Sequence, residues 1–325
     1  MGILVSINCI TYNQEDYIAD AIEGFLMQNT NFTYEILIGE DCSTDGTKEI
    51  VEQYVNKYPN KIRLITSKQN VGMGENGLRV FEQSKGKYIA VCEGDDYWTD
   101  PYKLQKQVDY MENNPECTLC FHNALIISAN IKTIIKKEKP MITRTNSYYR
   151  GGNSNYNAGE LALLGFVPTA SFLYPRHLMK NAPEWYHAAI VGDTPLKLIT
   201  TNHGYAHYID ENMSVYRVGV KDSVTDKWRK ENVNQENQVL LNKRFIDLYD
   251  DFNNYSNYKY DSEIRKVKIP FELIVLGLGG ERKKIKSSKF EEYIKRLSAK
   301  EKVRFYAKIY FPKSFAVLSR IKASI

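Results

Sequence analysis

The sequence lacks the features of secreted and membrane-spanning proteins. Its first residues, MGILVSINCITYN, contain no basic segment and no long apolar run, so we expect neither a secretory signal nor a spanning helix. Five cysteines are an odd number for a chain of 325 residues, which argues against a disulfide framework. Cys117 and Cys120 form a CxxC pair without a second pair, so we expect buried thiols and no zinc site. The sequence therefore predicts a cytoplasmic globular protein.

Acidic residues are scarce at the C-terminal end of the chain. Residues 282–325 contain 14 Lys or Arg and 3 Glu, a balance of +11. The whole chain carries +5, and +5 less +11 leaves −6 for residues 1–281. Because most of the chain is acidic, we expect no nucleic-acid partner.

Residues 1–127 alternate between short apolar segments and amphipathic segments. The apolar segments are typical of strands buried on both faces: ILVSINCI, YEILIG, KIRLIT, KYIAVC and TLCFHNALII. Helical spacing is found between them, in EDYIADAIEGFLMQ, GTKEIVEQYVNKY and PYKLQKQVDYMENN. This alternation predicts an α/β fold with a mainly parallel sheet. Beyond residue 227 the segments are helical and polar.

Three polar clusters follow the predicted strands. They are TYN at 11–13, GEDCSTDGT at 39–47 and EGDDYW at 93–98. In open parallel sheets, ligands bind outside the carboxyl ends of the strands. We therefore expect the three clusters to line one edge of the sheet.

The third cluster places Glu93, Asp95 and Asp96 directly after an apolar run. A strand-to-helix turn with capping acids is one interpretation, but capping requires one acid rather than three. Three desolvated carboxylates repel one another unless a cation or a ligand compensates them. Mn²⁺ and Mg²⁺ take oxygen ligands and commonly share them with a diphosphate, so we favour a metal site.

The second cluster admits a competing interpretation. Residues 41–52, DCSTDGTKEIVE, match the spacing of a calcium-binding EF-hand loop. However, the preceding YEILIG has no helical periodicity, and Thr47 already begins a predicted helix. We favour the alternative in which Asp41 ends a strand and accepts the N3–H of a uracil, while a neighbouring polar side chain caps the helix.

Several segments together resemble the family-two inverting glycosyltransferases. The resemblance lies in VSINCITYNQEDYIADAIEGFLMQ, YEILIGEDCSTDGTKEI, NVGMGENG and GKYIAVCEGDDYWTDPYKLQKQVDYM, and it is dense over residues 3–125. It implies a GT-A fold, a Rossmann-like and mainly parallel sheet flanked by helices. Residues 1–127 would then form the nucleotide-sugar half, 128–220 the acceptor half, and 221–325 a helical, basic C-terminal extension.

The resemblance also implies roles for individual residues. The residues implied to bind the nucleotide-sugar donor are Thr11, Tyr12, Asn13, Glu40, Asp41, Asp95 and Arg217. Tyr12 would pack on the base and Asp41 would recognise it, whereas Asp96, together with Asp95, would hold the Mn²⁺ or Mg²⁺. Relatives often carry a metal-binding histidine shortly after the Tyr-Arg pair that ends in Arg217. That histidine is absent here, which leaves Arg217 as a phosphate contact.

Inversion requires a base that deprotonates the acceptor hydroxyl. Relatives keep this acid at the start of a helix in the acceptor half, where IVGDTPLKLI offers Asp193. Asp193 either only caps this helix or also acts as the base. Its carboxylate stays ionised near neutral pH unless it is strongly desolvated.

The resemblance implies a metal-dependent enzyme that moves a sugar from a UDP-sugar to a saccharide or lipid-linked acceptor. The context would be a bacterial surface polysaccharide such as capsule or lipopolysaccharide. A sugar-phosphate nucleotidyltransferase is a second hypothesis, but NCITYNQEDY lacks the glycine-rich, basic loop that it requires. A non-catalytic nucleotide-sugar-binding protein is a third.

The C-terminal segment interleaves Lys and Arg with aromatic residues. Helical spacing relates Val303, Tyr306 and Tyr310 before Pro312, and Phe315, Leu318 and Ile321 after it. A basic amphipathic helix suits an anionic membrane surface, which would make the protein peripheral at the inner face of the plasma membrane. In the alternative interpretation, the helix packs on its own domain and its basic face is solvated.

Overall fold

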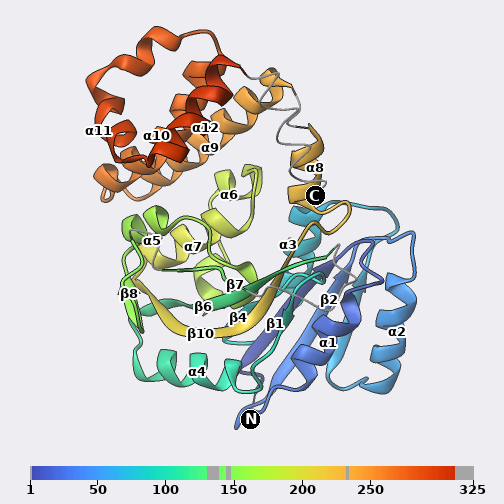
Figure 1. The fold of residues 1–325 in the computed structure, drawn as a ribbon. Coiled ribbons are helices and arrows are strands. Elements are labelled where there is room, and N and C mark those ends of the chain that lie inside the picture. Colours follow the sequence, from blue (N-terminus) through green and yellow to red (C-terminus); the bar gives the residue numbers. More distant parts are fainter. Residues whose placement is uncertain (1, 130–138, 144–147, 232–233, 312–325) are drawn as a thin grey trace. The chain divides into compact units, whose positions relative to one another are not determined.

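The computed structural model describes residues 2–129, 139–143, 148–231 and 234–311 (Figure 1). The chain forms two compact units, residues 1–221 and 222–325. The first unit contains all the strands found in the described residues, and the second is helical.

Four parallel strands form one half of the sheet. In spatial order they are β3 (Ile62–Thr66), β2 (Tyr34–Glu40), β1 (Val5–Thr11) and β4 (Tyr88–Val91). Each pairs with its neighbour in parallel register. Every residue of β2 is buried, as its continuous apolar sequence predicts for a strand covered on both faces.

The other half of the sheet is mixed. The order continues from β4 through β9 (Leu173–Pro175), β6 (Cys117–Ser128), β10 (Tyr205–Val218) and β5 (Tyr97–Trp98), with β7 (Lys139–Pro140) on β6 and β8 (Ser154–Tyr156) on β10. β10 runs parallel to β6 but antiparallel to β5 and β8, and β9 is antiparallel to both of its neighbours. The sheet is therefore mostly parallel where the ligand-binding edge is expected.

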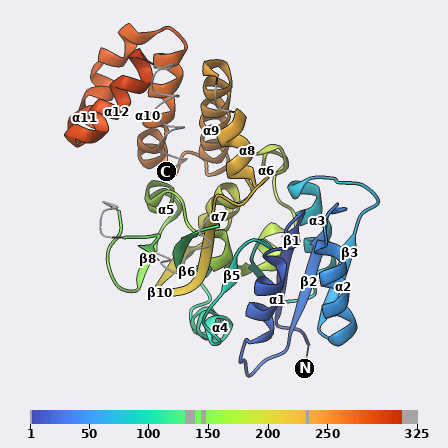
Figure 2. The same ribbon diagram turned by 45° about the vertical axis from the view of Figure 1, so that its right-hand side comes forward.

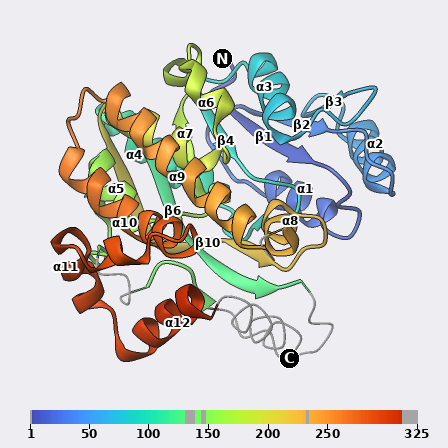
Figure 3. The same cartoon turned by 90° about the horizontal axis from the view of Figure 1, so that it is seen from above.

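Helices cover both faces of the sheet. α1 (Ile18–Leu26), α2 (Thr47–Lys57) and α4 (Lys103–Asn113) share a hydrophobic cluster with Ile36 and Ile38 of β2. α3 (Met73–Gln83) instead packs Val80 against Leu37. Because alternate residues of a strand point to opposite faces, α3 lies across the sheet from α1, as Figure 3 shows. Three further α-helices of this unit are α5 (Ala158–Leu164), α6 (Glu184–Ala188) and α7 (Asp193–Asn202).

The second unit is helical, as its sequence predicts. It contains α8 (Val224–Glu231), α9 (Gln235–Tyr255), α10 (Asp261–Leu278), α11 (Ser288–Arg296) and α12 (Ala299–Tyr310). A small core of Leu273, Ile285, Phe290 and Ile309 joins α11 and α12 to α10 (Figure 2). Phe315, Leu318 and Ile321, the second half of the predicted amphipathic pattern, lie outside the described residues. Over the described ranges, none of the helices combines the length and the apolar character needed to cross a bilayer.

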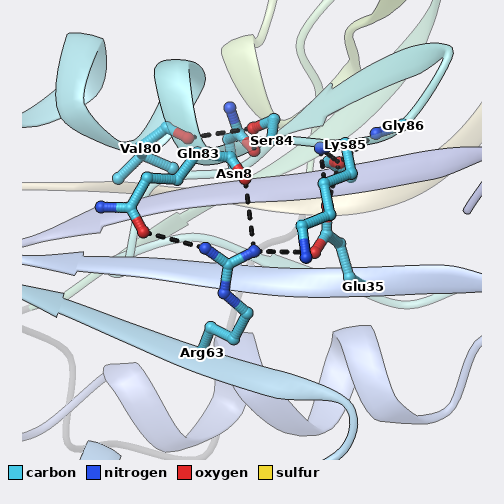
Figure 4. A network of polar contacts seen from close by, with 9 residues as sticks. Asn8, Glu35, Arg63, Val80, Gln83, Ser84, Lys85 and Gly86 are labelled. Carbon is cyan, nitrogen blue, oxygen red and sulfur yellow. Dashed lines mark hydrogen bonds and ion pairs between the residues drawn. The ribbon is translucent and has the colours of Figure 1, made fainter.

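A buried polar network stabilises the amino end of β2 (Figure 4). Glu35 is 5% exposed, and its Oε1 accepts hydrogen bonds from Ser6 Oγ at 2.7 Å and the Lys85 N–H at 2.8 Å. Its Oε2 lies 3.2 Å from Nη1 of Arg63. The Gly86 N–H donates to Ser6 Oγ, and a Cβ at Gly86 would lie 2.4 Å from the Ser6 nitrogen, so only glycine fits there. The network fixes the turn between α3 and β4.

We expect Glu35→Ala to lower the free energy of unfolding by about 2 to 3 kcal/mol, because it leaves several buried donors without their acceptor. Urea unfolding followed by circular dichroism measures this loss. Glu52→Ala is the matched control, since Glu52 is half exposed and forms only a 3.9 Å surface pair with Lys48. Equal midpoints for the two variants would show that the network contributes nothing to stability.

Lys103 is a fully buried lysine at the start of α4. Its Nζ donates to Gln107 Oε1 at 2.7 Å and lies 4.0 Å from the centre of the Trp98 ring. The Gln107 amide in turn donates to the carbonyls of Cys120 and Ser171. Burial lowers the pKa of Lys103 from 10.5 to about 7, so the folded protein favours the neutral amine.

Between pH 7 and pH 10.5 the folded chain therefore binds fewer protons at Lys103 than the unfolded chain does. Its contribution to the free energy of unfolding rises with pH in this interval, by about 2 kcal/mol from about pH 7 to about pH 9. Lys103→Met should remove that rise, whereas Lys87→Met, at an exposed lysine, should keep it. Urea unfolding at the two pH values tests this; parallel pH dependences for wild type and Lys103→Met would refute it.

Candidate active site

The carboxyl ends of β1, β2 and β4 lie side by side. Thr11 is the register partner of Glu40, and the Asp41 N–H donates to the Thr11 carbonyl at 3.1 Å. The Gly94 N–H donates to the Ile10 carbonyl at 3.0 Å. The three polar clusters that follow these strands therefore occupy one edge of the sheet.

Gln14 links the first and third clusters. Thr11 Oγ1 donates to Gln14 Oε1 at 2.8 Å, and the Gln14 side chain also bonds to Asp95. A Cβ at Gly94 would lie 2.5 Å from Gln14 Oε1, so glycine permits this close approach. Gln14 is not among the residues predicted from the sequence, and its place directly after the first cluster was the available signal.

The loops after β1 and β2 are held together in an unusual backbone conformation. Asn13 has φ 52° and Cys42 has φ 59°, values that residues other than glycine seldom adopt and that concentrate at functional sites. The Asn13 N–H donates to Ser43 Oγ at 3.0 Å, and Asn13 Oδ1 accepts the Thr44 N–H at 2.8 Å. These contacts fix the backbone directly after the half-buried Tyr12.

Asp41 organises the loop that leads into α3. Its Oδ1 accepts the Val71 N–H at 2.9 Å and the Ser67 hydroxyl at 3.2 Å, and its Oδ2 accepts the Gly72 N–H at 2.8 Å. A carboxylate oxygen has two acceptor sites, so Oδ2 retains capacity for one further donor. Asp41 thus has a structural role that the sequence did not predict and can still accept a bond from a ligand.

Glu40 is fully buried beside Asp41. Its Oε1 accepts the Ser43 N–H, whereas its Oε2 has no hydrogen-bond partner among the described residues. Buried polar atoms are nearly always paired, so an unpaired carboxylate oxygen at this edge is consistent with a donor supplied by a ligand or by water.

The local structure does not support the interpretation of residues 41–52 as an EF-hand loop. A strand, β2, precedes it where an EF-hand requires a helix. Asp45 Oδ1 accepts the Thr47 N–H at 3.0 Å and its hydroxyl at 2.6 Å, so Asp45 stabilises the start of α2.

Glu93, Asp95 and Asp96 form a desolvated group of carboxylates. Asp96 is 1% exposed, and its N–H closes a turn onto the Glu93 carbonyl at 3.1 Å. Burial raises the pKa of all three carboxyls, to about 8 for Glu93. The charge of Asp95 raises the pKa of Glu93 and Asp96 further. Desolvated carboxyls of this kind are either protonated or compensated by positive charge.

Arg217 of β10 supplies positive charge to this group. Its backbone N–H donates to Asp96 Oδ1 at 2.9 Å and its Nη1 to the Asp95 carbonyl at 2.7 Å. Its Nη2 contacts the Asp20 carboxylate. The guanidinium also lies 4.5 Å from the centre of the Tyr97 ring and is itself buried. Arg217 therefore fixes the acidic loop, a role additional to the predicted phosphate contact.

Asp193 is brought to the acidic group from the far side of the unit. Gly192 occupies the N-cap of α7, so Asp193 is the first helical residue rather than the cap; its Oδ1 accepts the Thr194 N–H at 2.7 Å. The charge of Asp193 contributes to the raised pKa of Glu93.

Lys197 lies one helical turn beyond Asp193 and was not singled out in the sequence. It is 2% exposed, and its Nζ donates to the Gly165 carbonyl. Burial raises the pKa of the Asp193 carboxyl, and the Lys197 charge opposes this rise. Lys197 therefore favours the ionised form of Asp193. The i, i+4 spacing of the two residues on α7 was the available signal.

A metal ion at this edge would need ligands beyond the protein's own side chains. No set of three or more His, Cys, Asp or Glu side chains within the described ranges is arranged to hold a metal ion. Mg²⁺ is usually bound through one or two carboxylates, with substrate phosphates and water completing the shell. Asp95 and Asp96 provide such a pair at the sheet edge.

Comparison with known families agrees with this geometry. The family model described as "Glycosyl transferase family 2" matches residues 6–177, more than half of the chain. The chain belongs to this family.

Curated relatives of this glycosyl transferase family 2 member match part of its length. Over 123 residues it is 47% identical to the uncharacterized protein Rv1520 of Mycobacterium tuberculosis, covering 38% of this chain and 36% of the relative. Over 108 residues it is 36% identical to the putative teichuronic acid biosynthesis glycosyltransferase TuaG of Bacillus subtilis, covering 33% of this chain and 42% of the relative. The alignments thus span well under half the length of these two relatives.

Solved structures match nearly the whole chain. Residues 1–349 of S. aureus TarS in complex with UDP-GlcNAc superpose with a TM-score of 0.58 at 15% identity, covering 99% of this chain and 83% of that TarS chain. The mannosyltransferase PcManGT of Pyrobaculum calidifontis in complex with GDP-Man and Mn²⁺ gives 0.57 at 11% identity, covering 98% and 86%. At these identities the similarity concerns the fold, and the predicted GT-A fold is confirmed.

Arg217→Met should lower the free energy of unfolding by about 3 kcal/mol near neutral pH, because the Asp95 and Asp96 carboxyls lose the positive charge that favours their ionised forms. The loss should shrink at about pH 5, since the carboxyls with raised pKa values are then protonated and need less compensation. Urea unfolding near neutral pH and at about pH 5 measures the loss in the free energy of unfolding at each pH. Arg265→Met, at an exposed arginine of the helical unit, is the control. A loss that is independent of pH would contradict the assigned role.

Proposed function

We propose that this family 2 member is a metal-dependent inverting glycosyltransferase. It transfers a sugar from a UDP-sugar to a saccharide or lipid-linked acceptor in the synthesis of a cell-surface polysaccharide. One observation carries the proposal: the charges of Asp95, Asp96 and Asp193, a residue nearly a hundred positions away, all raise the pKa of the same Tyr216 hydroxyl, and the charge of Asp193 also raises the pKa of Glu93.

The donor base and ribose bind at the first two clusters. Tyr12 packs on the base, and Asp41 Oδ2 accepts the uracil N3–H with its remaining acceptor site. Thr11 and Asn13 shape the loop, and Glu40 offers its unpaired Oε2 to a donor of the nucleotide. The complex of TarS with UDP-GlcNAc supports the choice of UDP.

The diphosphate binds at the third cluster. Asp96, assisted by Asp95, holds Mn²⁺ or Mg²⁺, which supplies charge stabilisation to the departing nucleoside diphosphate. Arg217 keeps the acidic loop in place through its contacts to Asp95 and Asp96 and adds a positive charge next to the phosphates. The presence of Mn²⁺ in the PcManGT complex supports the metal.

Asp193 acts as the catalytic base. Its carboxylate takes the proton of the acceptor hydroxyl while the acceptor oxygen bonds to the anomeric carbon. The bond from that carbon to the diphosphate breaks, its electron pair leaves with the nucleotide, and the configuration inverts. Lys197 maintains the ionised carboxylate that this step needs.

The acceptor half comprises residues 128–220, and the basic region 221–325 places the protein at the inner face of the plasma membrane. The relative TuaG is named for teichuronic acid biosynthesis, which supports a surface polysaccharide as the product. We propose a cytoplasmic protein that is peripheral at this membrane.

Thermal unfolding with UDP, GDP, dTDP or CDP, each with Mn²⁺ or with chelator, tests the donor site. A ligand at about a hundred times its dissociation constant adds roughly 2.7 kcal/mol to the free energy of unfolding, a shift of a few degrees. We expect a shift with UDP and Mn²⁺ that is lost in Asp96→Asn. In Asp193→Asn the shift should persist, while donor hydrolysis and transfer fall about 1000-fold.

Asp109→Asn, on the exposed face of α4, is the control and should retain both binding and turnover. Turnover that survives in Asp193→Asn would remove that residue from the role of base. UDP binding without hydrolysis or transfer in the wild type would favour the non-catalytic hypothesis. The absence of a shift with any nucleotide would refute the donor site.

A further inference from the structure

α12 has two different apolar faces. Phe305 and Ile309 point into the core of the helical unit, where Ile309 is fully buried. A Cβ at Gly277 would lie 2.7 Å from the Ile309 side chain, so α12 is seated directly on α10 at this point. This contact fixes which side of α12 is turned away from the core.

The second face carries a row of exposed apolar side chains. Val303 is 69% exposed, Tyr306 40% and Tyr310 42%. Spacings of three and four residues place them on one stripe of the helix, and Phe311, 68% exposed, follows directly. We call Val303, Tyr306 and Tyr310 the aromatic row. Contiguous exposed apolar side chains on a soluble surface commonly mark an interaction site.

Positive charge surrounds the aromatic row. α12 carries Lys300, Lys302, Arg304 and Lys308, and residues 282–311 contain eleven Lys or Arg against three Glu. The carboxylate of Glu301, the acidic residue of α12, is engaged by the Ser298 N–H at 2.8 Å in a capping box. The guanidinium of Arg282 lies 5.4 Å from the centre of the Tyr310 ring. The partner of this face must therefore be anionic as well as apolar.

We propose that the aromatic row of α12 binds the surface of an anionic lipid bilayer. Tyrosine combines an apolar ring with a polar hydroxyl and suits the boundary between headgroups and acyl chains. Basic side chains beside the row attract anionic headgroups, each strengthening binding roughly fivefold. A helix with an apolar stripe and a basic polar face is typical of proteins that lie in this interface.

Two other partners fit the same observations less well. A second copy of this face would bring two strongly basic surfaces together, which is electrostatically unfavourable. A nucleic acid would engage the cations through its phosphates but would not require an exposed valine between two tyrosines. An anionic bilayer complements the positive charge with its headgroups and takes up the aromatic row at its apolar boundary.

Cosedimentation of the full chain with vesicles tests the proposal. Vesicles of phosphatidylcholine alone are compared with vesicles of phosphatidylcholine and phosphatidylglycerol in equal parts, without donor or acceptor. We expect binding to the anionic vesicles that falls about tenfold or more in the triple variant Val303→Ser, Tyr306→Ser, Tyr310→Ser. The matched control Leu240→Ser, Tyr258→Ser replaces two side chains that are each 60% exposed, and it should bind like wild type.

A second variant separates charge from apolar contact. Lys300→Gln with Lys302→Gln should weaken binding to anionic vesicles roughly 30-fold, since two favourable charges are lost. All of these side chains are exposed or half-exposed, so melting temperatures close to that of wild type will confirm that the variants are folded.

Three outcomes would overturn the proposal. They are wild-type protein that does not bind anionic vesicles at low salt, a triple variant that binds as well as wild type, and a dimer that the triple variant converts to a monomer. The measurement needs no nucleotide, so its failure is distinguishable from a failure of the proposed transferase activity.

Discussion

The site depends on one electrostatic constraint: carboxylates that lie close together at a sheet edge and are removed from water must find positive charge. Arg217 provides part of it, since its charge lowers the pKa of the Asp95 and Asp96 carboxyls and its Nη1 donates to the Asp95 carbonyl. This requirement explains the course of β10, which runs parallel to β6 for its whole length and delivers Arg217 to the end of the acidic loop. The remaining demand for a cation is what a metal-bound diphosphate would satisfy.

Buried carboxylate oxygens are fully paired at one edge of the sheet and partly unpaired at the other. At the amino end of β2, both oxygens of Glu35 are paired with protein donors, and the network only stabilises the fold. At the carboxyl end of the same strand, Glu40 keeps an unpaired oxygen and two residues adopt positive φ. Strained and unsatisfied groups are costly to stability, and among the described non-glycine residues of the first unit positive φ is found at Asn13 and Cys42, both at this edge.

Periodicity was sufficient to predict the parallel strands, α1, α2 and α4, because buried strands and amphipathic helices leave strong local patterns. It missed α3, whose Gly74 and Gly77 weaken the helical signal, and β5, which is only two residues long. The proximity of Asp193 to Glu93 arises from tertiary packing, so only the family resemblance could anticipate it. The contacts of Asp41 with the loop before α3 likewise follow from long-range backbone geometry that no local pattern encodes.

The central claim is that Asp95 and Asp96 form the protein's share of a metal site completed by the nucleotide diphosphate. Anomalous diffraction from crystals grown with UDP and Mn²⁺ tests it most directly. The account predicts a single strong manganese peak within coordination distance of the Asp96 carboxylate and of both phosphates, absent from crystals of Asp96→Asn. Bound UDP with no manganese at these carboxylates, or manganese held elsewhere on the chain, would contradict it.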